Sequence, residues 1–261
     1  AGIILFSRNC VEPEQIRRLV GAAREASGQG DDFLVLIDQE GGRVQRLRPP
    51  LGRALPPADA YACLYCDDEN GAADAAFLSA RLLADDLKAL GINTNCAPVL
   101  DVPVPGAHDI IGDRAYGQSP DQVARLGRSV AEGFMAGGVL PVIKHIPGHG
   151  RATADSHLAL PVVDAPRDVL DATDFAPFKA LADMPAAMTA HVVFTAVDGD
   201  APASTSRRVT QEVIRGAIGF DGLLMSDDLS MKALSGPMSA RAEAVLAAGS
   251  DLALHCSGDF A

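Results

Sequence analysis

Short apolar runs that alternate with helical patterns constrain the fold of this chain more than any other feature. The runs are almost continuous in aliphatic residues, as expected for strands buried on both faces of a parallel sheet. They cover residues 2–6, 33–38, 92–101, 140–145, 186–191, 223–227 and 251–255. Because strands and helices alternate without a break in composition, the sequence predicts an α/β fold and a single domain over residues 1–261.

The segments between these runs have the spacing of amphipathic helices. The clearest covers residues 119–138, with Ser119 as the expected N-cap and Pro120 at the first helical position. Less regular patterns cover residues 12–26, 71–90, 207–218 and 237–248. Residues 167–182 contain Pro177, which predicts two helical pieces or a kink.

Nearly every predicted strand delivers a polar or ionisable group at its C-terminal end. These groups are Asn9, Asp38, Asp101, Lys144, His145, His191, Asp227 and His255. In a (β/α)8 barrel such ends converge on one mouth, whereas a doubly wound sheet concentrates its site at one switch point. We therefore predict a single (β/α)8 TIM-type barrel. Since only seven strands are found, we expect the 261 residues to lack the first strand and part of the C-terminal end.

Composition argues against several classes of function. The net charge of −12 opposes nucleic-acid binding, and no apolar stretch approaches the roughly 18 residues of a membrane span. The absence of Trp argues against a long aromatic-lined sugar cleft. Five Cys fit reduced thiols and a cytoplasmic location. Cys63 and Cys66 form a lone C-x-x-C, which we interpret as part of a surface loop rather than a zinc or redox motif.

The densest polar cluster is the segment KHIPGHGRATADSH, residues 144–157. A metal site could use His145, His149, Asp155 and His157, but a Pro-Gly pair between the first two His disrupts helical facing. Alternatively, Asp155 and His157 form an acid/base dyad, because i, i+2 spacing in an extended segment puts both on one side. The third interpretation is a loop held by internal hydrogen bonds. The residues favour the dyad.

Asp227 follows an apolar run, at the point where a barrel strand would reach the mouth. A carboxylate there can act as a nucleophile, a base or a metal ligand. Capping of the following helix is the structural alternative, for which Ser226 or Asp228 would serve equally well.

Several other residues can bind pairs of hydroxyl groups, namely Asp38, Arg46, Arg114, Lys144 and His145. Together with a candidate nucleophile and a candidate acid/base, they suit a sugar glycoside. Retaining hydrolysis needs one carboxylate that forms a glycosyl-enzyme and one proton donor that later becomes the base. A His performs the second task with a pKa already near neutrality.

Four strings resemble glycoside hydrolase family 3, and within it the bacterial β-N-acetylglucosaminidases (β-hexosaminidases) of peptidoglycan recycling. They are LVLIDQEGGRVQRL (34–47), GDRAYG (112–117), KHIPGHGRATADSH (144–157) and FDGLLMSDDLSMKAL (220–234). The third is the most specific, because general β-glucosidase members take their acid/base from elsewhere. Members usually begin upstream of residue 1 and run on past Ala261, and residues 61–70 match none of their motifs, so we expect a variable loop there.

The resemblance implies a role for each matched residue. Asp227 corresponds to the nucleophile, and His157, paired with Asp155, to the general acid/base. The implied binders of the N-acetylglucosamine unit are Asp38, Arg46, Arg114, Lys144 and His145.

The resemblance also implies an activity. We expect a retaining exo-β-N-acetylglucosaminidase of cell-wall turnover that acts on small-molecule N-acetylglucosaminyl-anhydromuropeptides. We expect a cytoplasmic monomer that uses no metal or other cofactor and binds neither nucleic acid nor membrane. The alternatives are a metal-dependent hydrolase built on the histidine cluster, a non-catalytic sugar-binding barrel, and a family phosphorylase with the same dyad.

Overall fold

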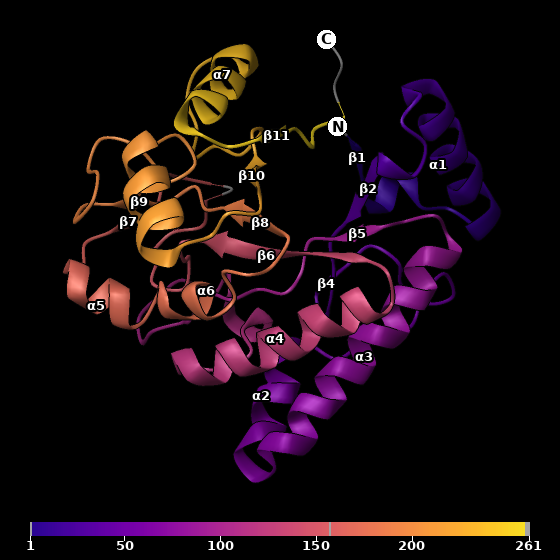
Figure 1. Ribbon diagram of the computed structural model, residues 1–261, viewed down its shortest axis with the longest axis horizontal. Helices are drawn as coiled ribbons and strands as arrows, with labels where there is room; N and C mark the ends of the chain where they lie inside the picture. Colours follow the sequence, from indigo (N-terminus) through magenta and orange to yellow (C-terminus); the bar gives the residue numbers. More distant parts are fainter. Residues whose placement is uncertain (1, 157, 259–261) are drawn as a thin grey trace. The chain divides into compact units, whose positions relative to one another are not determined.

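The computed structural model describes residues 2–156 and 158–258, in which parallel strands alternate with helices (Figure 1). The strands are β1 (Gly2–Leu5), β2 (Leu34–Ile37), β3 (Gln39–Gly41), β4 (Val44–Gln45), β5 (Thr94–Asn95), β6 (Leu140–Ile146), β7 (Val162–Val163), β8 (Ala186–Thr189), β9 (Val193–Phe194), β10 (Leu223–Asp228) and β11 (Leu252–Leu254). The α-helices are α1 (Pro13–Ser27), α2 (Ala58–Asp67), α3 (Glu69–Ala89), α4 (Pro120–Ala136), α5 (Arg167–Ala172), α6 (Ala176–Ala180) and α7 (Met238–Ala248). Short 3-10 turns form η1 (Ser7–Asn9), η2 (Gly30–Asp32) and η3 (Gly112–Arg114), and η4 (Val209–Ile218) is a π-helix. The predicted α/β fold class is confirmed.

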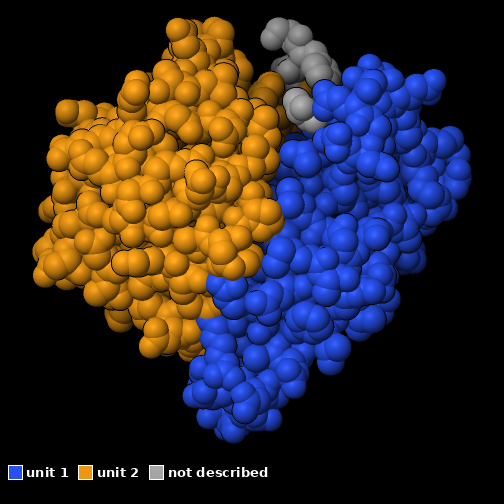
Figure 2. All heavy atoms as spheres, viewed as in Figure 1, with its two compact units in different colours: residues 1–98, 125–142 blue, residues 99–124, 143–261 orange. Residues whose placement is uncertain are grey.

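The chain divides into two compact units, which Figure 2 colours separately. Unit 1 contains residues 1–98 and 125–142, and unit 2 contains residues 99–124 and 143–261. Strand β6 and helix α4 have residues in both units, and each of the other described helices and strands lies within one unit. None of the helices in the described part of the chain is long and apolar enough to cross a membrane.

Unit 1 is built on parallel strands in the order β1-β2-β5-β6. The pairing of β1 with β2 aligns Ile3 with Val35, whose side chain is fully buried. The prediction of a long strand over residues 92–101 is wrong, since β5 is only two residues long. Pro98 explains part of the difference, because it has no N–H to donate to a ladder. Beyond it, a single bridge joins Val99 to Lys144.

Helix α4 packs closely against α3. A Cβ at Gly133 would come within 2.4 Å of the Phe77 carbonyl, and one at Gly137 within 2.2 Å of the Ala84 Cβ. Glycine therefore fits these positions because the two backbones approach each other. The predicted N-cap of α4 is confirmed, as Ser119 Oγ accepts from the Gln122 N–H at 3.3 Å.

Unit 2 contains parallel strands in the order β8-β10-β11, with β7 and β9 as a separate parallel pair. Its core includes the fully buried rings of Phe178, Phe194 and Phe220. The predicted interruption around Pro177 is confirmed, because α5 and α6 are two short helices.

Residues 61–67 and 69–70 are helical, so the prediction of a variable loop is wrong. Cys63 and Cys66 are exposed on α2. Asp68 separates α2 from α3, and its carboxylate caps the new helix by accepting from the Gly71 N–H at 2.9 Å. An N-cap carboxylate can start a second helix directly after the first, without an intervening loop.

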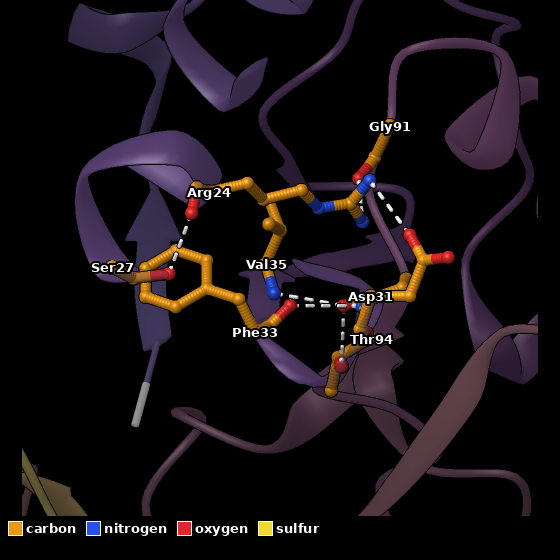
Figure 3. A network of polar contacts seen from close by, with 8 residues as sticks. Arg24, Ser27, Asp31, Phe33, Val35, Gly91 and Thr94 are labelled. Carbon is orange, nitrogen blue, oxygen red and sulfur yellow. Dashed lines mark hydrogen bonds and ion pairs between the residues drawn. The ribbon is translucent and has the colours of Figure 1, made fainter. Parts of the chain in front are cut away.

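The Asn93 side chain ties β2 to the segment that leads into β5. Its Oδ1 accepts from the Val35 N–H at 2.8 Å, and its Nδ2 donates to the Phe33 carbonyl at 3.0 Å. Figure 3 shows the surrounding polar network, which includes Arg24, Ser27, Asp31, Phe33, Val35, Gly91 and Thr94. The amide thus adds to the backbone bond by which the Asn93 N–H donates to the Val35 carbonyl at 3.3 Å.

We expect Asn93→Ala to lower the free energy of unfolding by about 2 kcal/mol, because it leaves the Val35 N–H and the Phe33 carbonyl unpaired. Urea denaturation measures this loss. Gln211→Ala, at an exposed amide of η4, is the matched control, with an expected change below about 0.5 kcal/mol. Equal effects of the two substitutions would contradict the role of Asn93.

Candidate active site

Asp38 and Arg46 form an ion pair at the C-terminal end of β2. Arg46 Nη2 lies 2.9 Å from Asp38 Oδ2, and both side chains stay partly exposed, at 25% and 15%. The Arg46 guanidinium also lies 4.8 Å from the centre of the Phe6 ring. A carboxylate and a guanidinium fixed side by side offer an acceptor and donors to adjacent hydroxyl groups. The structure therefore brings these two predicted sugar binders together.

Gln39, which the sequence analysis missed, sets the geometry of this pair. Its Oε1 accepts from the N–H groups of Arg46 and Leu47 at 2.8 and 3.0 Å, and its Nε2 donates to the Leu47 carbonyl at 2.8 Å. Asn95 fixes the Gln39 backbone through Oδ1 at 3.0 Å and Nδ2 at 2.9 Å. An amide two residues after an apolar run, directly behind the strand-end Asp38, is the sequence signal that could have indicated this role.

Asp101 is a buried anchor in unit 2 that the sequence analysis noted only as a strand-end acid. Its Oδ2 lies 2.7 Å from His145 Nδ1, and its Oδ1 accepts from the His149 N–H at 2.7 Å. Burial raises the pKa of Asp101, but the charge and hydrogen bond of His145 outweigh burial. The net pKa lies below the ordinary value. Asp101 is therefore an ionised carboxylate that orients His145.

His149 is buried beside His145, with ring centres 5.7 Å apart at 62°. Its Nε2 lies 3.2 Å from Ser156 Oγ. Burial, reinforced by the charge of His145, lowers the pKa of His149 to about 4. The ring is consequently neutral at pH 7.

The two acids at the end of β10 have different surroundings. Asp228 accepts from the N–H groups of Ser230 and Cys256 at 2.9 and 3.0 Å, and from the Ser230 hydroxyl. Asp227 Oδ1 accepts from the Asp228 N–H at 2.7 Å. The carboxylate of Asp228 thus holds the local loop together, as the capping alternative anticipated. The bonds described for Asp227 leave its carboxylate much less engaged.

Cationic neighbours keep Asp227 ionised. Burial raises the pKa of its carboxyl group, but the charges of His145, His191 and Lys144 outweigh burial, so the pKa lies below the ordinary value. His191, which the sequence analysis noted without assigning a role, also fixes the backbone here, with Nε2 lying 3.0 Å from the Asp228 carbonyl oxygen. An ionised, lightly bonded carboxylate is chemically competent as a nucleophile.

For the remaining predicted site residues the structure gives fewer contacts. Arg114 ends η3 and donates to the Ile110 carbonyl at 3.1 Å, and Lys144 is buried within β6. His157 lies outside the described residues, so the geometry of the Asp155–His157 dyad stays a prediction.

One premise of the dyad argument is wrong. The Asp155 carbonyl accepts from the Leu158 N–H at 2.9 Å and from the Ala159 N–H at 3.0 Å, so a turn begins there instead of an extended segment. Strand alternation therefore does not place Asp155 and His157 on one side, and the dyad rests on the family resemblance. Among residues 2–156 and 158–258, no group of three or more His, Cys, Asp or Glu could hold a metal ion.

Comparison with known proteins gives consistent matches over the whole chain. The family model described as the glycosyl hydrolase family 3 N terminal domain matches residues 1–261. A beta-hexosaminidase of Alkalilimnicola ehrlichii is 41% identical over 260 residues, which cover 98% of this chain and 73% of that protein. One from Bordetella pertussis is 39% identical over 264 residues, covering 100% of this chain and 74% of the relative.

Solved structures agree with this similarity. NagZ from Neisseria gonorrhoeae, in complex with N-trifluoroacetyl-D-glucosamine, superposes with a TM-score of 0.90 at 37% identity, over 98% of this chain and 74% of that one. At this identity the likeness confirms the predicted (β/α)8-type fold class.

We expect acidification to unfold the protein partly through His149. The unfolded side chain takes up a proton near pH 6.5 and the folded one only near pH 4, so the unfolded state binds more protons across this window. Between pH 7 and pH 4 the wild type should lose about 3 kcal/mol more stability than His149→Gln. Urea denaturation at a series of pH values measures the difference, and parallel pH profiles would contradict it.

Proposed function

The chain belongs to glycoside hydrolase family 3, and on that premise we propose that it is a retaining exo-β-N-acetylglucosaminidase. One observation supports this proposal above all. Asp227 is an ionised carboxylate at the end of β10, while its neighbour Asp228 takes over the local structural bonds. Such a carboxylate suits the formation of a covalent glycosyl-enzyme.

In the proposed first step, an Asp227 oxygen attacks the anomeric carbon and the bond to the leaving oxygen breaks. His157 gives its proton to that oxygen, and Asp155 stabilises the imidazolium. In the second step His157 removes a proton from water, which attacks the same carbon and releases the sugar from Asp227. Electrostatic interactions with His145, His191 and Lys144 lower the pKa of Asp227 and so favour its ionised form.

Five side chains are proposed to bind the N-acetylglucosamine unit, namely Asp38, Arg46, Arg114, Lys144 and His145. The short Asp38–Arg46 ion pair supports this role, since its carboxylate and guanidinium are fixed before substrate arrives. Preorganised groups lose little conformational entropy on binding. A pocket for one sugar built from such residues needs no Trp platform.

We propose further that the substrates are N-acetylglucosaminyl-anhydromuropeptides and that residues 1–261 act as one catalytic domain, as a cytoplasmic monomer. The substrate proposal is supported by the similarity to NagZ and to proteins named beta-hexosaminidase. All five cysteines are free thiols, which suits a reducing compartment.

We expect Asp227→Ala to lower the hydrolysis of nitrophenyl N-acetyl-β-glucosaminide at least about 1,000-fold, because no covalent intermediate can form. Release of nitrophenol measures the rate. Asp221→Ala, at an exposed acid of unit 2, should leave the rate unchanged. Equal rates for wild type and Asp227→Ala would refute the nucleophile assignment.

Three further arms of that assay address the alternatives. Added phosphate should yield no sugar 1-phosphate, the formation of which would identify a phosphorylase. A chelator should leave the rate unchanged, whereas a loss restored by metal would indicate a metal-dependent hydrolase. The corresponding nitrophenyl glucoside should react far more slowly than the N-acetylglucosaminide.

We expect Asp155→Ala to reduce kcat about 100-fold while KM changes less than about 3-fold, because the acid acts on proton transfer and not on binding of the sugar. Steady-state kinetics on the same glycoside measure both constants. A variant that raises KM and preserves kcat would show that Asp155 binds substrate instead.

A further inference from the structure

We infer that His149 and Ser156 are positioning residues, which hold Asp155 in place for its part in proton transfer. The inference rests on the proposed function and adds two residues to which that function assigns no step. Both residues are buried, with exposed fractions of 3% and 2%. Neither is placed to exchange protons freely with solvent.

Hydrogen bonds of its backbone hold His149 in place, in addition to the contact of its ring with Ser156. Its N–H donates to Asp101 Oδ1 at 2.7 Å, and its carbonyl accepts from the Ala152 N–H at 3.1 Å. The ring packs edge-on against the ring of His145. From this position Nε2 lies 3.2 Å from Ser156 Oγ, so the hydroxyl is held by a rigid partner.

Ser156 also connects the turn to the segment that follows the nucleophile. Its carbonyl accepts from the Ala233 N–H at 3.2 Å. That segment is in turn held to β10, because the Met231 N–H donates to the Asp228 carbonyl at 3.1 Å. Asp155 directly precedes Ser156 in the chain, so a shift of Ser156 would move Asp155.

The His149 ring fills its buried site at a greater cost in stability than an apolar side chain would. Its Nδ1 is buried and has no hydrogen-bond partner among the described residues. An unpaired buried polar atom is destabilising, and an apolar side chain would avoid that cost. The neutral ring loses least if its proton is on Nε2 and donates to Ser156 Oγ. This hydrogen bond is the property that an apolar residue of similar size could not supply.

A general acid works only within hydrogen-bond reach of the leaving oxygen, about 2.6–3.2 Å. A loosened turn should therefore impair protonation of the leaving group, while attack by Asp227 and binding of the sugar continue. The loss should be large for a glycoside whose leaving group needs a proton. It should be small for one whose leaving group departs as a stable anion.

The test compares phenyl and dinitrophenyl N-acetyl-β-glucosaminides as substrates of Ser156→Ala. We expect kcat/KM to fall about 10-fold on the phenyl glycoside and less than about 2-fold on the dinitrophenyl glycoside. Ser250→Ala is the matched control, because it removes a buried hydroxyl without a partner, and it should change neither value. Equal losses on both glycosides would overturn the inference, since a general structural defect affects both.

Substitutions of His149 provide a second measurement. In His149→Gln the side-chain amide can still donate to Ser156 Oγ, so the phenyl glycoside should react within about 3-fold of wild type. His149→Met should show the same leaving-group-dependent loss as Ser156→Ala. The double variant His149→Met/Ser156→Ala should lose no more than the worse single variant, because the two residues act through one bond. Multiplying losses would overturn the inference.

The activity of the wild type distinguishes failure of the proposed function from failure of the positioning role alone. If it hydrolyses neither glycoside, the proposed function fails and the positioning role fails with it. If it hydrolyses both, but the variants lose the same factor on each glycoside, only the positioning role fails. Thermal unfolding of each variant confirms that the compared proteins are folded.

Discussion

The hydrogen bonds of the buried Asp101 carboxylate are the interactions on which the candidate site in unit 2 depends. An ionised acid in the protein interior must have hydrogen-bond donors, and Asp101 takes them from the His145 ring and the His149 backbone. The His145 ring, which Asp101 orients, also interacts with Asp227 and helps to lower the pKa of that carboxyl group.

The acidic residues at the strand ends have two kinds of role. Asp101 and Asp228 hold the local structure, whereas Asp227 is available for reaction. Asp101 and Asp228 each accept several hydrogen bonds from the protein, Asp101 from histidine N–H groups and Asp228 from two backbone N–H groups and a hydroxyl. Asp227 accepts from one neighbouring N–H and keeps its charge through cations instead of a full set of donors. A carboxylate whose charge is favoured but whose oxygens are lightly engaged remains available to attack a substrate.

The sequence predicted most of the fold because it depends on local patterns. Ser119 at the N-cap and Pro120 after it predicted α4, and apolar runs predicted strands such as β2, β6 and β10. The failures occurred where tertiary contacts override local preference. A strand was predicted over residues 92–101, but the structure has only the two-residue strand β5 there. Helix α2 lies where a loop was expected. The turn at Asp155 is another such case, since hydrogen bonds that no periodic pattern encodes define it.

By itself, the sequence determined the α/β fold class, the family and the chemical types of the candidate residues, because periodicity and local motifs carry this information. Only the tertiary structure decided how the acids are used. In the structure Asp228 accepts hydrogen bonds from the loop that follows β10, whereas Asp227 remains available for reaction. The structure also shows that Gln39 holds the backbone of Arg46 by a hydrogen bond. It also linked His149 to Ser156. The physical reason is that hydrogen bonding and charge at a buried group depend on its neighbours in space, which the order of residues along the chain does not specify.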